Sequence, residues 1–292
     1  MTEIPAGRAL TVLLLAGQRE GRVDPLAEAS GVTLKALVPV AGRPMLLHAL
    51  TTLAATPTVG KIVVSINAGS GIDRLPDVAA LLPDVAALLR DGRLEIRDAR
   101  PNLVDSVLSA LDGQEFPVLV TTADNVLLTP ATVAEIDGAA RERGADVAVA
   151  LARREDVLAA HPDGQRRFYR FGCGYYSNCN SYWIGKRAAL APAELFRTGG
   201  QFVKHPSRVI GALGVAGLFE LVRFRFGIGT LEQGCARLSK RFRLSIKPIV
   251  VSDGSTAIDV DAERSLKVAE EVIARRRAGT AGQPDARAFA AA

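Results

Sequence analysis

ALTVLLLAG (Ala9–Gly17) is an apolar run that ends at a glycine, and a polar loop follows it as far as about Lys35. A short, continuous apolar run predicts a strand that is buried on both faces, as the strands of a parallel sheet are. In open α/β sheets the ligand binds beyond the carboxyl ends of such strands. We therefore expect the residues that follow this strand to line a binding site.

Short apolar runs and longer amphipathic segments alternate along the first half of the chain. Further strands are expected at Lys61–Asn67, Arg93–Ala99, Phe116–Asn125 and Ala145–Arg153. Helices are expected at Arg43–Thr56, in part of Leu75–Leu89, at Val104–Leu111 and at Pro130–Arg143. Strands that alternate with crossover helices predict a Rossmann-like, three-layer α/β fold with a mostly parallel sheet.

The pattern changes after about residue 153. Phe168–Gly185 is aromatic and alternating, which indicates a strand pair or a long edge strand. Helical segments are expected from Ala188 to Arg241, a strand at Arg243–Val251 and a last helix at Ala262–Arg277. We expect a single domain over residues 1–277, with a first half to about residue 153 and a second half that carries a C-terminal helical elaboration. Residues 278–292 are expected to be a disordered tail.

The composition is that of a globular protein. Of 292 residues, 48% are hydrophobic and 23% are charged, which excludes wholesale disorder. The net charge of +5 suits an anionic small ligand, a membrane surface or a nucleic acid. Three cysteines without a C-x-x-C pair suggest neither a disulfide framework nor a zinc site. Because neither a secretory leader nor an apolar segment of membrane-spanning length is recognised, a cytoplasmic location is expected.

Basic side chains and a glycine gather around the loop after the first strand. Gly17 allows backbone to approach a ligand closely, and Arg19, Arg22 and Lys35 supply positive charge. Backbone amides with Arg and Lys beside them form a cradle for a triphosphate. Neither the P-loop pattern nor G-x-G-x-x-G is present, so these residues alone leave a basic, solvated loop as the alternative.

Three carboxylates are candidates for a metal site. One buried strand ends at Asp124, which places a carboxylate at the ligand edge of the sheet. A carboxylate buried there needs a partner such as a cation. Capping of a helix is the alternative role for Asp124. Asp259 and Asp261 share a face if their segment is extended, so either could reach a metal ion. Carboxylates that converge from distant parts of a chain on one divalent ion fit Mg²⁺.

Several segments of the chain, in this order, resemble the MobA-like NTP transferase superfamily of GT-A-type nucleotidyltransferases. They are LAG (Leu15–Gly17), KALVPVAGRPML (Lys35–Leu46), RPNLVDSVLSAL (Arg100–Leu111), VLVTTADNVLLTP (Val118–Pro130) and IDVDAERSL (Ile258–Leu266). The resemblance implies a GT-A fold and an enzyme that transfers a nucleotidyl group from an NTP. One departure is Gln18, since many relatives read L-A-G-G or L-A-A-G where this chain has L-A-G-Q.

The same resemblance implies roles for individual residues. Arg19, Lys35 and Asp124 would take part directly in the transfer. Leu15, Ala16 and Gly17 would contact the base and ribose, and Arg19 and Lys35 the phosphates. Asn102 and Ser106 would lie at the base, and Thr122 on the nucleotide side. Asp124 would bind Mg²⁺ together with Asp261, which matches the motif position and is favoured over Asp259.

The second half of the chain falls where relatives bind the acceptor. Its aromatic segment contains Asn178 and Asn180, which suit a sugar or polyol phosphate, although aromatic strands are as often core. Nearby cations able to recognise an acceptor phosphate are Arg166, Arg167, Arg170, Lys186 and Lys204. Pro206–Arg243 is apolar at its centre and basic at its edges, which fits a buried helix pair, a dimer contact or a peripheral contact with the inner face of the membrane.

These features together predict an Mg²⁺-dependent nucleotidyltransferase. An NTP, with CTP preferred, would react with a phosphorylated small-molecule acceptor (a sugar, polyol or lipid-pathway alcohol phosphate) and release pyrophosphate. The alternatives are a GT-A glycosyltransferase that uses a nucleotide sugar and a non-catalytic nucleotide-binding protein. No nucleic-acid partner is expected, because the positive charge is spread along the chain without a known reader motif.

Overall fold

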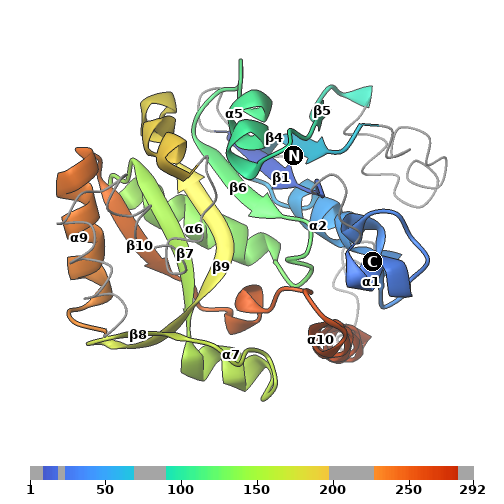
Figure 1. Ribbon diagram of the computed structural model, residues 1–292. Coiled ribbons are helices and arrows are strands. Elements are labelled where there is room, and N and C mark those ends of the chain that lie inside the picture. Colours follow the sequence, from blue (N-terminus) through green and yellow to red (C-terminus); the bar gives the residue numbers. More distant parts are fainter. Residues whose placement is uncertain (1–8, 19–23, 69–89, 197–226, 282–292) are drawn as a thin grey trace, which may run out of the picture.

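The computed structural model describes residues 9–18, 24–68, 90–196 and 227–281 (Figure 1). A sheet of eight strands runs through this part of the chain in the order β10-β7-β9-β6-β1-β4-β5, with β8 paired to β9. Its strands are β1 (Leu10–Leu15), β4 (Val59–Ile66), β5 (Leu94–Asp98), β6 (Val118–Thr122), β7 (Val147–Arg153), β8 (Tyr169–Phe171), β9 (Gly174–Ile184) and β10 (Ile246–Val250). A separate small sheet pairs β2 (Pro39–Val40) with β3 (Arg43–Pro44).

Helices connect most of these strands. The α-helices in the described ranges are α1 (Pro25–Ala29), α2 (Met45–Ala54), α5 (Leu103–Ala110), α6 (Pro130–Glu142), α7 (Arg154–Ala160), α9 (Leu231–Phe242) and α10 (Glu263–Ala281). The 3-10 helices are η1 (Lys35–Leu37), η3 (Arg187–Phe196) and η4 (Gly254–Ala257). The helix expected within Leu75–Leu89 and the tail beyond Ala281 lie outside the described residues.

The sheet is mostly parallel, as predicted. β1 pairs in parallel with β4 and β6, β4 with β5, and β10 with β7. β9 is antiparallel to both of its neighbours, β6 and β7. The aromatic segment therefore forms a strand pair, β8 with β9, as one of the two expectations had it. β9 lies inside the sheet and not at its edge, which brings its polar residues next to the end of β6.

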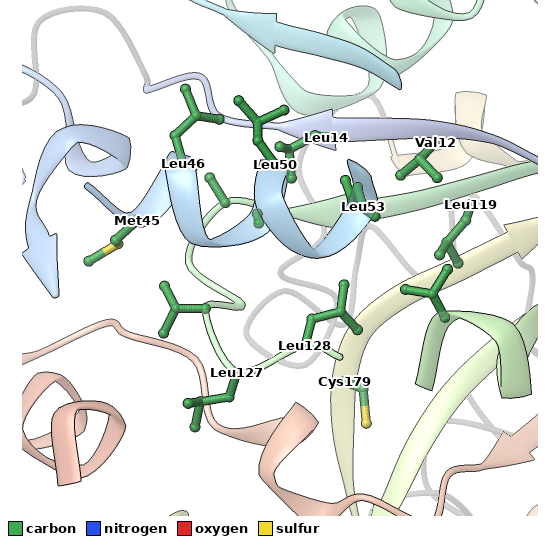
Figure 2. Close-up of a cluster of buried hydrophobic side chains, with 14 of the residues drawn as sticks. Val12, Leu14, Met45, Leu46, Leu50, Leu53, Leu119, Leu127, Leu128 and Cys179 are labelled. Carbon is green, nitrogen blue, oxygen red and sulfur yellow. The ribbon is translucent and has the colours of Figure 1, made fainter. Parts of the chain in front are cut away.

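Successive side chains of a buried strand point to opposite faces of the sheet, so the hydrophobic core has two parts, one on each face. Val12 and Leu14 of β1 belong to the larger cluster, which includes residues of α2, α6 and α10. Leu13 of β1 and Val118 of β6 belong to a second cluster, with α5 and η3. Figure 2 shows part of the larger cluster, where leucines of α2 lie against β1. Helices on both faces of a sheet give the three layers that the sequence predicted.

A few boundaries differ from the expected ones. Pro44, expected in the first turn of a helix, is the N-cap residue of α2. The last helix does not end at Arg277 but continues to Ala281. The loop after the first strand contains the short helix α1, because the side chain of Asp24 accepts hydrogen bonds from two backbone N–H groups of its first turn. None of these differences changes the order of the strands.

The segment Pro206–Arg243 is described only from residue 227 onward. There, α9 packs Leu231 against Leu151 of β7 and Tyr176 of β9. Leu231 of α9 is thus part of the core, whereas the apolar centre of the segment lies outside the described residues. Among the residues that the structure describes, no helix is both long and apolar enough to cross a membrane.

Asp137 ties α6 to the sheet. It is 4% exposed, and its Oδ1 accepts hydrogen bonds from Trp183 Nε1 and from Arg141 Nε, each at 2.8 Å. Asp137→Ala is expected to lower the free energy of unfolding by about 2–4 kcal/mol, because a buried indole N–H and a guanidinium lose their acceptor. Urea denaturation followed by circular dichroism measures this loss. The exposed neighbour Glu142→Ala is the control, and equal effects of the two substitutions would refute the role of Asp137.

Candidate functional site

The carboxyl ends of β1, β4, β5 and β6 meet at one edge of the sheet. Just beyond β1, the backbone N–H of Ala16 donates to the carbonyl of Ser65 at 2.8 Å, which continues the pairing with β4. A Cβ on Gly17 would lie 2.7 Å from the Cβ of Ala99, so a larger residue would push away the chain that follows β5. Leu15–Gly17 is therefore held at the edge where the sequence placed the binding site.

Gln18 joins three segments of this edge. Its backbone N–H donates to Asn67 Oδ1 at 2.6 Å, and Asn67 Nδ2 donates to the carbonyl of Gln18 at 2.8 Å. Its side-chain Oε1 accepts from the backbone N–H of Lys35 at 3.2 Å. The residue that departs from the relatives' pattern thus positions Lys35. Sequence reasoning missed Asn67, although an asparagine that ends a predicted strand at this edge was a signal for it.

Lys35 forms the centre of a cluster of charges. Its Nζ lies 2.6 Å from Asp124 Oδ2 and 2.5 Å from Asp261 Oδ1. The side chains of Lys35 and Asp124 are 22% and 20% exposed, whereas that of Asp261 is 71% exposed at the rim. Burial works to lower the pKa of Lys35, but the two carboxylates outweigh it and hold that pKa above its usual value. Lys35 therefore stays charged throughout the physiological pH range.

Asp259 is the buried member of the cluster. It is 9% exposed, and its Oδ2 accepts a hydrogen bond from Asn180 Nδ2 at 2.6 Å. Burial, with the negative charges of Asp124 and Asp261, raises the pKa of Asp259 to about 8 against the opposing effect of Lys35. Asn180 reaches this carboxylate because β9 lies beside β6.

The backbone of Asn180 has a left-handed conformation. Its φ is +46°, and the pairing of β9 with β7 shifts register between Val149 and Leu151, the stretch that faces Asn180. Such an irregularity re-aims a side chain. It directs the amide of Asn180 to the carboxylate of Asp259, a contact that the sequence did not predict.

The carboxylates fit a divalent metal ion in chemical type. Asp124 Oδ1 and Asp259 Oδ1 are buried, and within the described part of the chain neither has a hydrogen-bond partner. Buried carboxylate oxygens need a cation or a donor, and Mg²⁺ takes oxygen ligands. Over the described ranges, no three His, Cys, Asp or Glu side chains are arranged as a ready metal centre. Two acids of this cluster, Asp124 and Asp261, instead pair with the ammonium of Lys35.

The residues expected near the base lie at the start of α5. Asn102 Oδ1 caps the helix by accepting from the backbone N–H of Asp105 at 2.9 Å. Ser106 is 5% exposed, and its Oγ accepts from the backbone N–H of Arg100 at 2.8 Å and donates to the carbonyl of Asn102 at 3.0 Å. These bonds order the loop after β5. Thr122, at the end of β6, has a buried hydroxyl without a partner in the described chain.

Of the expected site residues, three cannot be placed and one lies away from this edge. Arg19, Arg22 and Lys204 lie outside the described residues. Lys186, expected near the acceptor, pairs with Asp146 at 2.7 Å. Asp146 precedes β7, so this pair lies at the opposite edge of the sheet and takes no part in the cluster.

The sequence profile of the MobA-like NTP transferase domain matches residues 12–210, more than half of the chain. The chain belongs to the MobA-like NTP transferase family. It is a nucleotidyltransferase, as its motifs predicted, and the matched region includes Lys35 and Asp124. A search of curated proteins finds no match.

Solved structures share the fold of this NTP transferase. A hypothetical transferase from Thermus thermophilus is 25% identical with a TM-score of 0.69, over 89% of this chain and 99% of that one. A 4-diphosphocytidyl-2C-methyl-D-erythritol synthase from Anaerococcus prevotii is 12% identical with a TM-score of 0.56, over 92% and 97%. A CMP:2-keto-3-deoxy-manno-octonic acid synthetase, solved with CTP, is 15% identical with a TM-score of 0.53, over 92% and 99%. The predicted fold class is confirmed.

Proposed function

We propose that this NTP transferase joins a nucleoside monophosphate, from CTP, to a phosphorylated small-molecule acceptor and releases pyrophosphate with the help of Mg²⁺. The acceptor would be a sugar, polyol or lipid-pathway alcohol phosphate. The observation that carries the proposal is the cluster at the carboxyl edge of the sheet, in which Lys35 meets Asp124 and Asp261. It combines a permanently charged side chain for phosphate with carboxylates for a metal ion.

The protein's own groups position the reactants and balance their charge. An oxygen of the acceptor phosphate attacks the α-phosphorus of the NTP, and the bond from that phosphorus to the pyrophosphate oxygen breaks. Lys35, which stays protonated, donates to the departing pyrophosphate and stabilises its negative charge. Arg19 is proposed to assist it. Because an acceptor phosphate is already ionised at neutral pH, the reaction needs alignment more than a general base.

Asp124, Asp259 and Asp261 are the proposed metal ligands. Mg²⁺ bound there supplies a Lewis acid that neutralises charge on the phosphate oxygens. The unpartnered oxygens of Asp124 and Asp259 are open to the ion, and Asp261 is proposed to complete the site from the rim. Asp261, which the sequence favoured over Asp259, lies at the exposed rim and pairs with Lys35.

The acceptor is proposed to bind beside β9. Asn178 Nδ2 donates to Tyr182 Oη at 2.7 Å and to Asn180 Oδ1 at 2.9 Å. Tyr182 is 37% exposed, so a polar, aromatic surface lies next to the carboxylate cluster. Amides and an aromatic ring of this kind suit a hydroxylated acceptor. The names of two structural neighbours, a diphosphocytidyl synthase and a CMP synthetase, support CTP as the donor.

A pyrophosphate-release screen tests this proposal. Each of the four NTPs is combined with sugar, polyol and lipid-alcohol phosphates, with Mg²⁺ and with EDTA, and products are identified by mass spectrometry. CTP with one acceptor class is expected to give equal amounts of pyrophosphate and cytidine-linked product. Lys35→Ala should weaken the response, whereas Lys61→Ala, on β4 and paired with Glu95, should not. Transfer from a nucleotide sugar without pyrophosphate would instead identify a glycosyltransferase.

A further inference from the structure

The ammonium of Lys35 lies where a cation shared by Asp124 and Asp261 would lie. Its Nζ is 2.6 Å from one carboxylate and 2.5 Å from the other, and these acids come from distant parts of the sequence. The remaining buried oxygens of Asp124 and Asp259 are unpartnered in the described chain. In this state, the lysine is the cation that balances the acids.

A metal ion bound to both Asp124 and Asp261 would compete with this ammonium. Mg²⁺ binds carboxylate oxygens at about 2.1 Å. If the ion bound Asp124 and Asp261 while Lys35 kept its contacts, two positive centres would lie within a few ångströms in a half-buried site, where their repulsion is weakly screened. Binding of the ion to these two carboxylates therefore favours displacement of the ammonium.

The lysine side chain is the part that can move. Its backbone is fixed, because it opens η1 and its N–H donates to Gln18 Oε1 at 3.2 Å. The carboxylates are fixed too: the carbonyl of Asp124 accepts from the backbone N–H of Val260 at 3.1 Å, and the N–H of Asp261 donates to Ser265 Oγ at 2.9 Å. Four flexible methylene groups allow the ammonium to swing while these anchors hold.

We propose that Lys35 is a displaceable counter-ion for the metal site, so that the protein takes up its divalent ion together with the nucleotide and resists taking it up alone. The inference rests on the metal site proposed above. A triphosphate offers Lys35 anionic oxygens in exchange for those of Asp124 and Asp261. Without nucleotide, the ammonium would exchange two carboxylates for uncharged surroundings, and the metal ion has to compete with it.

Mn²⁺ binding without nucleotide tests this inference. Free Mn²⁺ is measured by electron paramagnetic resonance on the metal-free protein and on Lys35→Met, which keeps the side chain's length and removes its charge. The variant is expected to bind Mn²⁺ at least about tenfold more tightly, because charge-assisted bonds no longer have to be broken. Lys35→Arg, which keeps the charge, should bind as weakly as the unmodified protein.

Two controls separate this effect from others. Lys61→Met removes one positive charge from β4, away from the cluster, and should leave Mn²⁺ affinity within about twofold. Equal Mn²⁺ affinity for Lys35→Met and the unmodified protein would overturn the inference while leaving the metal site intact. Absence of Asp124-dependent Mn²⁺ binding even with CTP would overturn the metal site itself, and the inference with it.

A measurement on the unmodified protein tests the inference even if the Lys35→Met variant fails to fold. Acylation of lysines is followed by mass spectrometry as Mg²⁺ is added without nucleotide. Displacement should expose the amine of Lys35 and raise its labelling severalfold at millimolar Mg²⁺, while the labelling of Lys61 stays constant. Unchanged labelling of Lys35 when the metal is bound would contradict the displacement of its ammonium by the metal ion.

Discussion

Asp124→Asn is expected to lower Mg²⁺-dependent pyrophosphate release by about a thousandfold or more without unfolding the protein. An asparagine has no anionic oxygen for the metal ion, and loss of a metal ligand removes several kcal/mol of transition-state stabilisation. The fold should survive, because the backbone carbonyl of Asp124 still accepts from Val260 at 3.1 Å. Steady-state pyrophosphate release and circular dichroism measure the two effects.

A surface aspartate supplies the matched control for Asp124→Asn. Asp112 is 75% exposed on its side chain and pairs with Arg187 at 2.6 Å, away from the cluster. Asp112→Asn makes the same chemical change and should leave turnover within about twofold. Near-normal turnover in Asp124→Asn would remove Asp124 from the metal site.

Asp259→Asn is expected to make the metal-free protein more stable and less active. The pKa of Asp259 is raised to about 8, so at neutral pH folding holds this carboxyl in an environment that disfavours its charge. An asparagine can still accept from Asn180, and its amide would replace a repulsive contact with the neighbouring acids. The expected gain in the free energy of unfolding is about 2–4 kcal/mol at pH 8.

The sign of the pH dependence follows from the direction of the shift. Between the usual pKa of an aspartate and about 8, the folded protein binds more protons at Asp259 than the unfolded chain does. The contribution of Asp259 to stability is therefore fully present at low pH and falls as pH rises through this window. Replacement by asparagine should remove that fall, so the gain should be small near pH 4 and largest near pH 8.

Thermal denaturation in EDTA across pH 4 to 9 measures this difference between the two proteins. The melting temperatures should separate by several degrees at pH 8 and converge at pH 4. The melting temperature of Asp112→Asn should equal that of the unmodified protein at every pH. A gain that does not change with pH would show that Asp259 titrates normally, and a loss at every pH would show that its carboxylate stabilises the fold.

The strand order of the first half could be predicted because buried strands are short apolar runs. The carboxyl edge followed from that order, and with it the expectation that Lys35 and Asp124, 89 residues apart in the chain, lie at the same edge, although not that they contact each other. The motif resemblance supplied the roles of the individual residues, and the family match confirmed the class of enzyme. Local pattern and strand order were enough to place these two residues at one edge of the sheet.

The position of β9 could not be predicted. Alternation of residues along Phe168–Gly185 is the same whether a strand lies at the edge of a sheet or inside it, and the choice depends on pairing with β6 and β7. The contact of Asn180 with Asp259 follows from that pairing and was missed for the same reason. Favouring Asp261 over Asp259 came from motif position alone, which carries no information on burial.

Thermal-shift measurements with the four NTPs, with and without Mg²⁺, test the central claim most directly. A ligand that binds the native state raises its melting temperature by mass action. CTP is expected to raise the melting temperature of the unmodified protein only when Mg²⁺ is present, and to leave Asp124→Asn unchanged. If no NTP shifts the unmodified protein, or if Asp124→Asn responds equally to CTP with Mg²⁺, the metal-dependent nucleotide site at the carboxyl edge is contradicted.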